Sequence, residues 1–205
     1  MRYVLATATA LLLAGSAQAA TLVNGSFELG ISPGGYTTVA GGDSTSITGW
    51  TVGGGGVDYI GSYWIASDGV RSIDLSGGAP GSVSQTFATI AGRSYAVTFD
   101  LSANPDVGAG LKDLLVSAGA TSTLYQVGQA GYPLTWTPTS FLFTALGSTS
   151  TLTFTSGANN SSWGPAIDNV AASIVPVPEP ATWMMLIAGF GLVGVAARRS
   201  KPVAA

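Results

Sequence analysis

The stretch Ser94-Tyr-Ala-Val-Thr-Phe-Asp-Leu101 alternates between apolar side chains and small or polar ones. Tyr95, Val97, Phe99 and Leu101 fall on one face of an extended chain, because successive side chains of a strand point to opposite sides. This period of two predicts a strand with one face buried and the other face in solvent.

The same alternation recurs along the middle of the chain. Clusters of Gly, Pro, Asn and Asp separate the alternating segments, and no convincing helix is predicted between the two ends. Regularly spaced short strands predict an all-β fold over residues 20–175, a single antiparallel β-sandwich of jelly-roll type. The further strands are predicted around Val83 and Phe87, Phe141 and Phe143, and Leu152 and Phe154, and over 70–75, 114–118, 122–127 and 167–175.

The composition excludes several kinds of chemistry. Only 8% of the 205 residues are charged, against about 25% in typical soluble domains. Histidine and cysteine are both absent, which excludes Ser-His-Asp and Cys-His catalysis, disulfides and the common zinc sites. Residues 20–175 carry three cations against nine carboxylates, a net charge of −6. Nucleic acid is therefore disfavoured as a partner, because phosphate binding needs clustered Lys and Arg.

The N-terminal end has the pattern of a secretory signal peptide. Arg2 precedes an uncharged apolar run over 4–14, and Ala17-Gln18-Ala19 fits the small-x-small cleavage rule. We predict a signal peptide over 1–19, with the secretion translocon and signal peptidase as partners. The alternative is a first buried helix, although such a short run suits a signal segment better than a membrane span.

The C-terminal end combines an apolar run with a basic tail. Residues 181–197 contain no charge and are followed by Arg198, Arg199 and Lys201. Seventeen residues is the short limit for a membrane span. We predict one transmembrane helix over 181–197 with a cytoplasmic basic tail over 198–205, in keeping with the positive-inside rule.

Three parts stand in order at this end: Pro178-Glu179-Pro180 after a proline-rich linker, Trp183 at the head of the apolar run, and the pair Arg198-Arg199. Together they resemble a PEP-CTERM sorting signal. The resemblance is to the variant with Trp three residues after the second proline, and it assigns 176–205 to the sorting segment. It implies a membrane-embedded exosortase that cuts near Pro-Glu-Pro in Gram-negative bacteria that make exopolysaccharide or biofilm matrix. A plain permanent anchor is the alternative.

Four segments lie in order along the middle of the chain: 22–28 (LVNGSFE), 68–75 (DGVRSIDL), 81–87 (GSVSQTF) and 164–170 (GPAIDNV). Together they resemble the choice-of-anchor C family. That family has a galactose-binding-like jelly roll. Galactose-binding-like modules often hold a structural calcium between an acidic residue after the first strand and an aspartate on the last, which by position are Glu28 and Asp168. Carboxylates suit this hard cation, but both side chains could instead accept hydrogen bonds from turn amides.

Ligand-binding residues are predicted where aromatic and acidic side chains gather. Tyr59, Tyr63 and Trp64, beside Asp58 and Asp68, form the densest such cluster. The alternative for each aromatic side chain is a place in the core, which is the stronger prediction for the tryptophan after Gly49. Trp163 and the stretch 132–136 are secondary candidates for ligand contact.

The leading prediction is a non-enzymatic protein that is exported, transiently anchored in the inner membrane, and then held at the cell surface or in the extracellular matrix. A glycan-binding module that takes extracellular polysaccharide is the first alternative. The second is a surface glycosidase, which needs two converging carboxylates; Asp58, Asp68 and Asp74 lie near one another in sequence.

Overall fold

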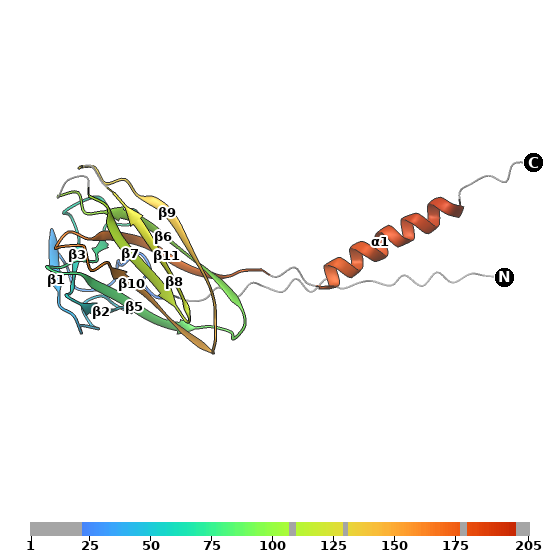
Figure 1. Cartoon of the computed structure of the whole chain (residues 1–205), viewed down its shortest axis with the longest axis horizontal. Helices are drawn as coiled ribbons and strands as arrows, with labels where there is room; N and C mark the ends of the chain where they lie inside the picture. Colours follow the sequence, from blue (N-terminus) through green and yellow to red (C-terminus); the bar gives the residue numbers. More distant parts are fainter. Residues whose placement is uncertain (1–21, 107–109, 129–130, 177–179, 200–205) are drawn as a thin grey trace, which may run out of the picture. The chain divides into compact units, whose positions relative to one another are not determined.

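The computed structural model describes residues 22–106, 110–128, 131–176 and 180–199. The chain forms two separate compact units, the first ending at Ile174 and the second beginning at Val175. The strands of the first unit form the two layers of a sandwich, and the second unit contains the helix α1 (Figure 1).

Two antiparallel sheets make up the first unit, so the predicted sandwich is confirmed. From β4 to β11, successive strands cross between the sheets except at the β7–β8 hairpin, as they do in a jelly roll. The six-stranded sheet has the order β1 (Tyr36–Val39), β3 (Val57–Ile60), β4 (Ser72–Asp74), β11 (Pro165–Ile174), β6 (Ser94–Ala103), β9 (Thr137–Thr144). The five-stranded sheet has the order β2 (Thr51–Gly54), β5 (Gly81–Ala88), β10 (Thr149–Ser156), β7 (Lys112–Ala118), β8 (Thr121–Val127).

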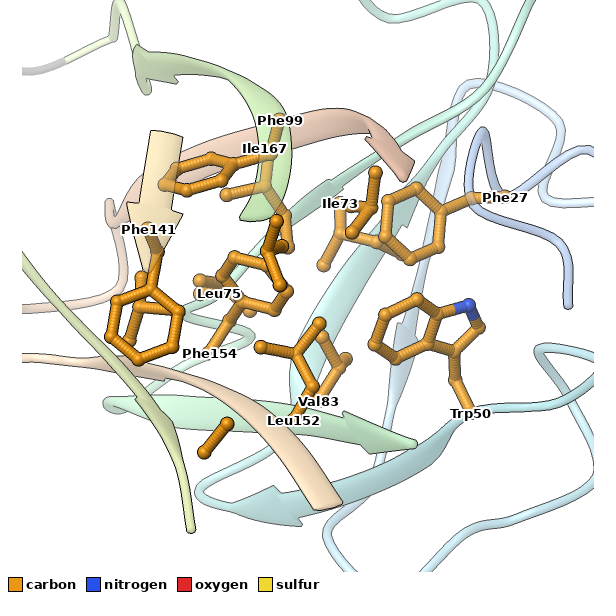
Figure 2. Packing of buried hydrophobic residues seen from close by; sticks show 14 of the residues in the cluster. Phe27, Trp50, Ile73, Leu75, Val83, Phe99, Phe141, Leu152, Phe154 and Ile167 are labelled. Atoms are coloured by element: carbon orange, nitrogen blue, oxygen red, sulfur yellow. The ribbon is translucent and has the colours of Figure 1, made fainter. Parts of the chain in front are cut away.

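The core lies between the sheets and is built from the inward face of each strand. All four apolar residues of the stretch 94–101 are buried, as the alternation predicts. The Phe154 ring lies with its centroid 5.1 Å from Phe99 and 6.3 Å from Trp50. Figure 2 shows these three side chains among the aliphatic residues of both sheets. Trp50 is thus a core residue, as predicted, and its indole Nε1 donates to the Asn24 carbonyl at 2.9 Å.

The predicted strands differ from the observed ones near the start of the domain. The strand predicted over 70–75 is reduced to β4, because the amides of Val70 and Arg71 donate to the Glu28 carboxylate. The short strands β1, β2 and β3 were not predicted, since glycine-rich turns surround them.

The segment 22–28 lies beside β11 without forming a strand. Asn24 and Phe27 have φ of 56° and 58°, in the left-handed region that breaks extended pairing. The Val170 amide donates to the Gly25 carbonyl at 2.9 Å. Within the described residues no strand precedes Glu28, in contrast to the galactose-binding-like pattern that the family resemblance implied.

The second unit contains the helix α1 (Pro180–Arg199), so a helix is present where the apolar run predicted one. Within the described residues no helix is long and apolar enough to cross a membrane, which corrects the prediction of a transmembrane helix over 181–197. A span needs about 20 predominantly apolar residues. Here the uncharged run is seventeen residues, three of them glycine, and the helix ends in two arginines.

Candidate functional site

The outer face of the six-stranded sheet carries a polar row that crosses three neighbouring strands. Val57 and Tyr59 point into the core, so the alternation of β3 turns Asp58 outward. The pairing register sets Asp58 opposite Thr38 of β1 on one side and opposite Asp74 of β4 on the other. Two aspartates therefore stand as cross-strand neighbours on one face of the sheet.

The loop 61–71 covers part of this outer face and is held there by two carboxylates. Glu28 Oε1 accepts hydrogen bonds from the Val70 and Arg71 amides, each at 2.8 Å. Asp168 Oδ2 accepts from the Ser67 amide at 2.8 Å and the Asp68 amide at 2.9 Å. Both carboxylates position the loop that carries Tyr63 and Trp64.

Trp64 joins this loop to the sheet beneath it. Its indole Nε1 donates to Ser72 Oγ at 2.8 Å, and its ring is buried against Ile60 and Ala166. Leu134 and Trp136 pack on the same small apolar cluster from the loop before β9. The cluster is separate from the main core and fixes two loops on the outer face.

Asp74 is enclosed and fully hydrogen-bonded. Its Oδ1 accepts from the Ser76 and Gly164 amides at 3.0 Å each, and its Oδ2 accepts from Asn104 Nδ2 at 2.7 Å. Burial raises the pKa of Asp74 to about 7, because desolvation outweighs these donated hydrogen bonds. This aspartate therefore holds the backbone amides of Ser76 and Gly164 in place.

The Asp106 carboxylate joins the loop that carries Tyr63 to the loop that carries Tyr132. Asp106 Oδ2 accepts from the Tyr63 hydroxyl and Asp106 Oδ1 accepts from the Tyr132 hydroxyl, each at 2.9 Å. The hydrogen bond to this carboxylate raises the pKa of Tyr63. Both phenols therefore remain protonated donors at neutral pH.

Two clefts open on either side of Tyr63 and Trp64. The larger cleft, of about 820 Å³, is lined mainly by backbone and apolar groups of the loops 32–34, 61–71 and 132–134, together with Arg71. The smaller cleft, of about 340 Å³, lies over the polar row of β1 and β3. It is lined by Tyr36, Thr38, Asp58, Ile60, Tyr63, Trp64, Gly77, Gly78, Asn104, Asp106, Ser162 and Trp163.

The smaller cleft combines exposed aromatic rings with carboxylates. Tyr36 and Tyr63 meet edge to face with centroids 5.2 Å apart, and Trp163 adds a third partly exposed ring. The half-buried Asp58 accepts a hydrogen bond from Thr38 Oγ1 at 2.5 Å, and desolvation raises its pKa. The cleft thus offers apolar ring faces beside strong hydrogen-bond acceptors.

The predicted ligand residues separate in the structure. Tyr63 lies at the rim of both clefts and Trp64 forms part of their walls, so the structure brings these two together. Tyr59 lies wholly inside the core, where its hydroxyl donates to the Phe27 carbonyl and accepts from Arg71 Nη1. It lines neither cleft in the described part of the chain.

Tyr36 and Asp106 were missed at the sequence level. Each is an isolated residue beside a turn, after Gly34-Gly35 and after Asn104-Pro105. Only the pairing of β1 with β3 and the contact with Tyr63 bring them to the site. The secondary candidate Trp163 does line the smaller cleft, and Tyr132 lines the larger one.

Glu28 and Asp168, the predicted calcium ligands, are used as amide acceptors. Asp168 Oδ1 also accepts from the Asn169 amide at 2.7 Å, and burial raises the pKa of Asp168 to about 7. In the described part of the chain no three His, Cys, Asp or Glu side chains are grouped to hold a metal ion. Calcium prefers six to eight oxygen ligands, which this arrangement does not assemble, so calcium binding stays a prediction.

The three carboxylates considered for glycoside hydrolysis do not share one exposed site. Asp68 Oδ2 accepts from Ser26 Oγ at 2.6 Å, away from the smaller cleft, and Asp74 is shielded from solvent. Of the three, Asp58 lines the smaller of the two clefts, and neither Asp68 nor Asp74 lines either of these two.

The predicted signal peptide lies outside the described residues, and so do its cleavage residues Ala17 and Ala19. Pro178 and Glu179 of the sorting motif lie outside them as well. Pro180 begins α1, Trp183 is exposed on it, and Arg198 lies in its last turn before Arg199 ends it.

Fold and site together define a protein with one antiparallel β-sandwich and a cleft of aromatic and acidic residues on one sheet. The chain belongs to the DUF642 family, described as a protein of unknown function, which matches residues 20–173. The PEP-CTERM protein-sorting motif matches residues 176–200, which confirms that resemblance. The choice-of-anchor C assignment stays a prediction.

One curated relative is halomucin of Haloquadratum walsbyi. It is 40% identical over 182 residues, covering 80% of this chain but 2% of halomucin. The chain therefore spans a small fraction of the length of the curated relative it matches.

The fold also resembles solved carbohydrate-binding modules at low sequence identity. A family 35 module from Clostridium thermocellum is 12% identical, with 67% of this chain and 96% of the module covered and a TM-score of 0.46. TmCBM61 in complex with β-1,4-galactotriose is 19% identical, with 76% and 98% covered and a TM-score of 0.46.

Proposed function

We propose that this chain is an exported surface protein whose sandwich domain binds extracellular polysaccharide in the smaller cleft without catalysing a reaction. The observation that carries the proposal is the meeting of Tyr36, Tyr63 and Trp163 with Asp58 and Asp106 around one cleft. Sugars present apolar C–H faces that pack on aromatic rings and hydroxyl groups that donate to carboxylates. Ligand sites typically combine such apolar walls with a few convergent polar groups.

The burial and hydrogen bonding of the aspartates near the smaller cleft favour binding over catalysis. Asp74 is enclosed, and both oxygens of Asp106 already accept hydrogen bonds from tyrosines. Glycoside hydrolysis needs two carboxyl groups that can both reach the glycosidic bond. Asp58 is left without such a second carboxyl group among the described residues of the smaller cleft, which favours binding.

The export part of the proposal rests on the two ends of the sequence. The sorting motif supports an exosortase as processing partner, and the halomucin relative supports a surface location. Binding of matrix polysaccharide would give the processed protein an adhesive or structural role outside a Gram-negative cell. The signal segment supplies the route to the secretion translocon and signal peptidase.

Calorimetric titration of the full chain with a panel of exopolysaccharide oligomers tests the binding site. Trp163→Ala is expected to weaken binding about tenfold, or 1.4 kcal/mol, because it removes an aromatic wall of the smaller cleft. Leu124→Ala is the matched control, since Leu124 is exposed on β8 of the other sheet. Equal affinity of the Trp163→Ala variant and the unaltered chain would place the glycan elsewhere, and no binding to any oligomer would end the proposal.

A further inference from the structure

The smaller cleft carries negative charge without a neighbouring cation. Asp58 and Asp106 are the charged residues among those that line it. Of the domain's three cations, Arg71 lines the larger cleft and donates to the Ile31 carbonyl and the Tyr59 hydroxyl. Arg93 lies in the turn between β5 and β6, and Lys112 lies at the start of β7 in the other sheet. No described side chain therefore neutralises the cleft.

Two features of the structure leave the negative charge of the Asp58 carboxylate poorly stabilised. In the described part of the chain its carboxylate accepts one hydrogen bond, from Thr38 Oγ1. Its direct cross-strand partner on the same face is another acidic residue, Asp74, which offers no positive charge. Desolvation raises the pKa of Asp58, and the neighbouring Asp58 contributes to the raised pKa of Asp74. A bound cation would relieve both effects.

The aromatic rim adds a second attraction for the same kind of ligand. Tyr36, Tyr63 and Trp163 are 51%, 42% and 37% exposed and all line the smaller cleft. The negative face of an aromatic ring attracts an ammonium group, and the attraction strengthens where water is partly excluded. Rings and carboxylates at one cleft are thus chemically suited to an organic ammonium ion.

We propose that the smaller cleft selects glycans that carry a protonated amino group over neutral glycans and over glycans that carry carboxylates. The inference rests on the proposed function, since it names the class of sugar that this same cleft takes. The ammonium group would donate to the Asp58 carboxylate while the ring of the amino sugar packs against the tyrosines. A uronate would instead bring a further negative charge into a cleft that Asp58 and Asp106 already line.

The test compares three oligosaccharides of equal length on the full chain in EDTA at about pH 6: a glucosamine oligomer, its N-acetylated form and a galacturonate oligomer. Calorimetric titration is expected to give about tenfold tighter binding of the glucosamine oligomer than of the N-acetylated one, as one charge-assisted hydrogen bond would provide. Galacturonate is expected to bind most weakly. EDTA removes any metal ion that could bridge a carboxylate ligand to the cleft.

Two variants assign the preference to the smaller cleft. Asp58→Asn is expected to bind the glucosamine and N-acetylated oligomers within about threefold of each other, because the charge is gone and the shape is kept. Tyr36→Ala, at an exposed position on an edge strand, is expected to reduce the preference independently of Asp58. Asp113→Asn is the matched control, because Asp113 lies on β7 of the other sheet.

Several results would overturn the inference. Equal affinity for the aminated and N-acetylated oligomers, or tighter binding of galacturonate, contradicts it while leaving glycan binding intact. If Asp58→Asn and Tyr36→Ala both keep the full preference for the glucosamine oligomer, a site other than this cleft selects the ligand. No binding of any oligomer contradicts the proposed function itself, so the two failures are distinct.

Discussion

At the residue scale, the carboxylates of this domain serve mainly as acceptors that fix loops. Asp74 joins β4 to the loops at Asn104 and Gly164. Glu28 and Asp168 hold the loop that bears Tyr63 and Trp64. Because these carboxylates already accept hydrogen bonds from loops, few acidic side chains are available to contact a ligand. It also makes the stability of the domain sensitive to the protonation of particular aspartates.

We expect the domain to be more stable at mildly acidic pH than at alkaline pH. Burial raises the pKa of Asp74 and of Asp168 to about 7, from a usual 3.8. Between these values the folded state holds protons that the unfolded chain has released, so the free energy of unfolding falls as pH rises from about 4 to about 7. Thermal unfolding at about pH 5 and about pH 8 measures this difference.

Asp74→Asn should reduce the pH dependence of the melting temperature, since it removes one of the two carboxyl groups with a raised pKa. Asp113→Asn, on the other sheet, should leave it in place. A melting temperature that is unchanged or higher at about pH 8 would contradict the assignment.

Glu28 should stabilise the loop through its hydrogen bonds to two amides. Glu28→Ala leaves the Val70 and Arg71 amides without that acceptor and should cost about 1 kcal/mol. Glu28→Gln keeps an acceptor oxygen and should recover most of the loss. Chemical unfolding in EDTA measures both, and equal losses in the two variants would refute the amide role.

The same variants test the calcium prediction. If Glu28 and Asp168 bind calcium, added calcium raises the melting temperature of the unaltered chain but not that of Glu28→Ala. An unchanged melting temperature of the unaltered chain would rule out a stabilising calcium ion there.

At the element scale, apolar alternation predicted the long strands and missed the short ones. β6, β9 and β10 each bury two or more aromatic or branched residues on one face, which leaves a clear period of two. The strands β1 and β3 are four residues each, too short for a clear period. They are defined by pairing with each other, and this pairing places Tyr36 and Asp58 in the smaller cleft.

The segment 22–28 depends on close contact with β11. A Cβ atom at Gly25 would lie 1.8 Å from the Val170 carbonyl oxygen. Gly25→Ala should therefore destabilise the domain by about 3 kcal/mol or more, because backbone on both sides would have to move. Gly35→Ala is the control, since its added Cβ meets nothing within 4 Å. Thermal unfolding compares the two variants, and equal melting temperatures would refute the contact.

At the scale of the whole molecule, the sandwich and the sorting segment are separate units with separate tasks. The sandwich carries the cleft that we propose as the glycan site, and the end of the chain carries the sorting motif at 176–200. The low overall charge reflects both units, because two long apolar runs lie at the ends and the middle is rich in uncharged polar residues.

We expect the native protein to be cleaved near both ends of its sequence. Intact-mass and terminal analysis of the native protein should find that residues 1–19 are absent and that the new C-terminus lies near Pro178. Removal of the exosortase from the producing cell should leave the C-terminal segment in place. Recovery of the unprocessed 205-residue chain from the cytoplasm would contradict export.

The sequence by itself determined the sandwich, its main core residues and the sorting motif. Each depends on a local pattern: alternation along one strand, or an ordered set of residues along one segment. The tertiary structure decided which aromatic and acidic residues share a cleft. It placed Tyr59 in the core, Trp64 in the wall, and Tyr36, Asp58, Asp106 and Trp163 around one opening. The physical reason is that strand register and loop docking, which join residues far apart in sequence, create the cleft.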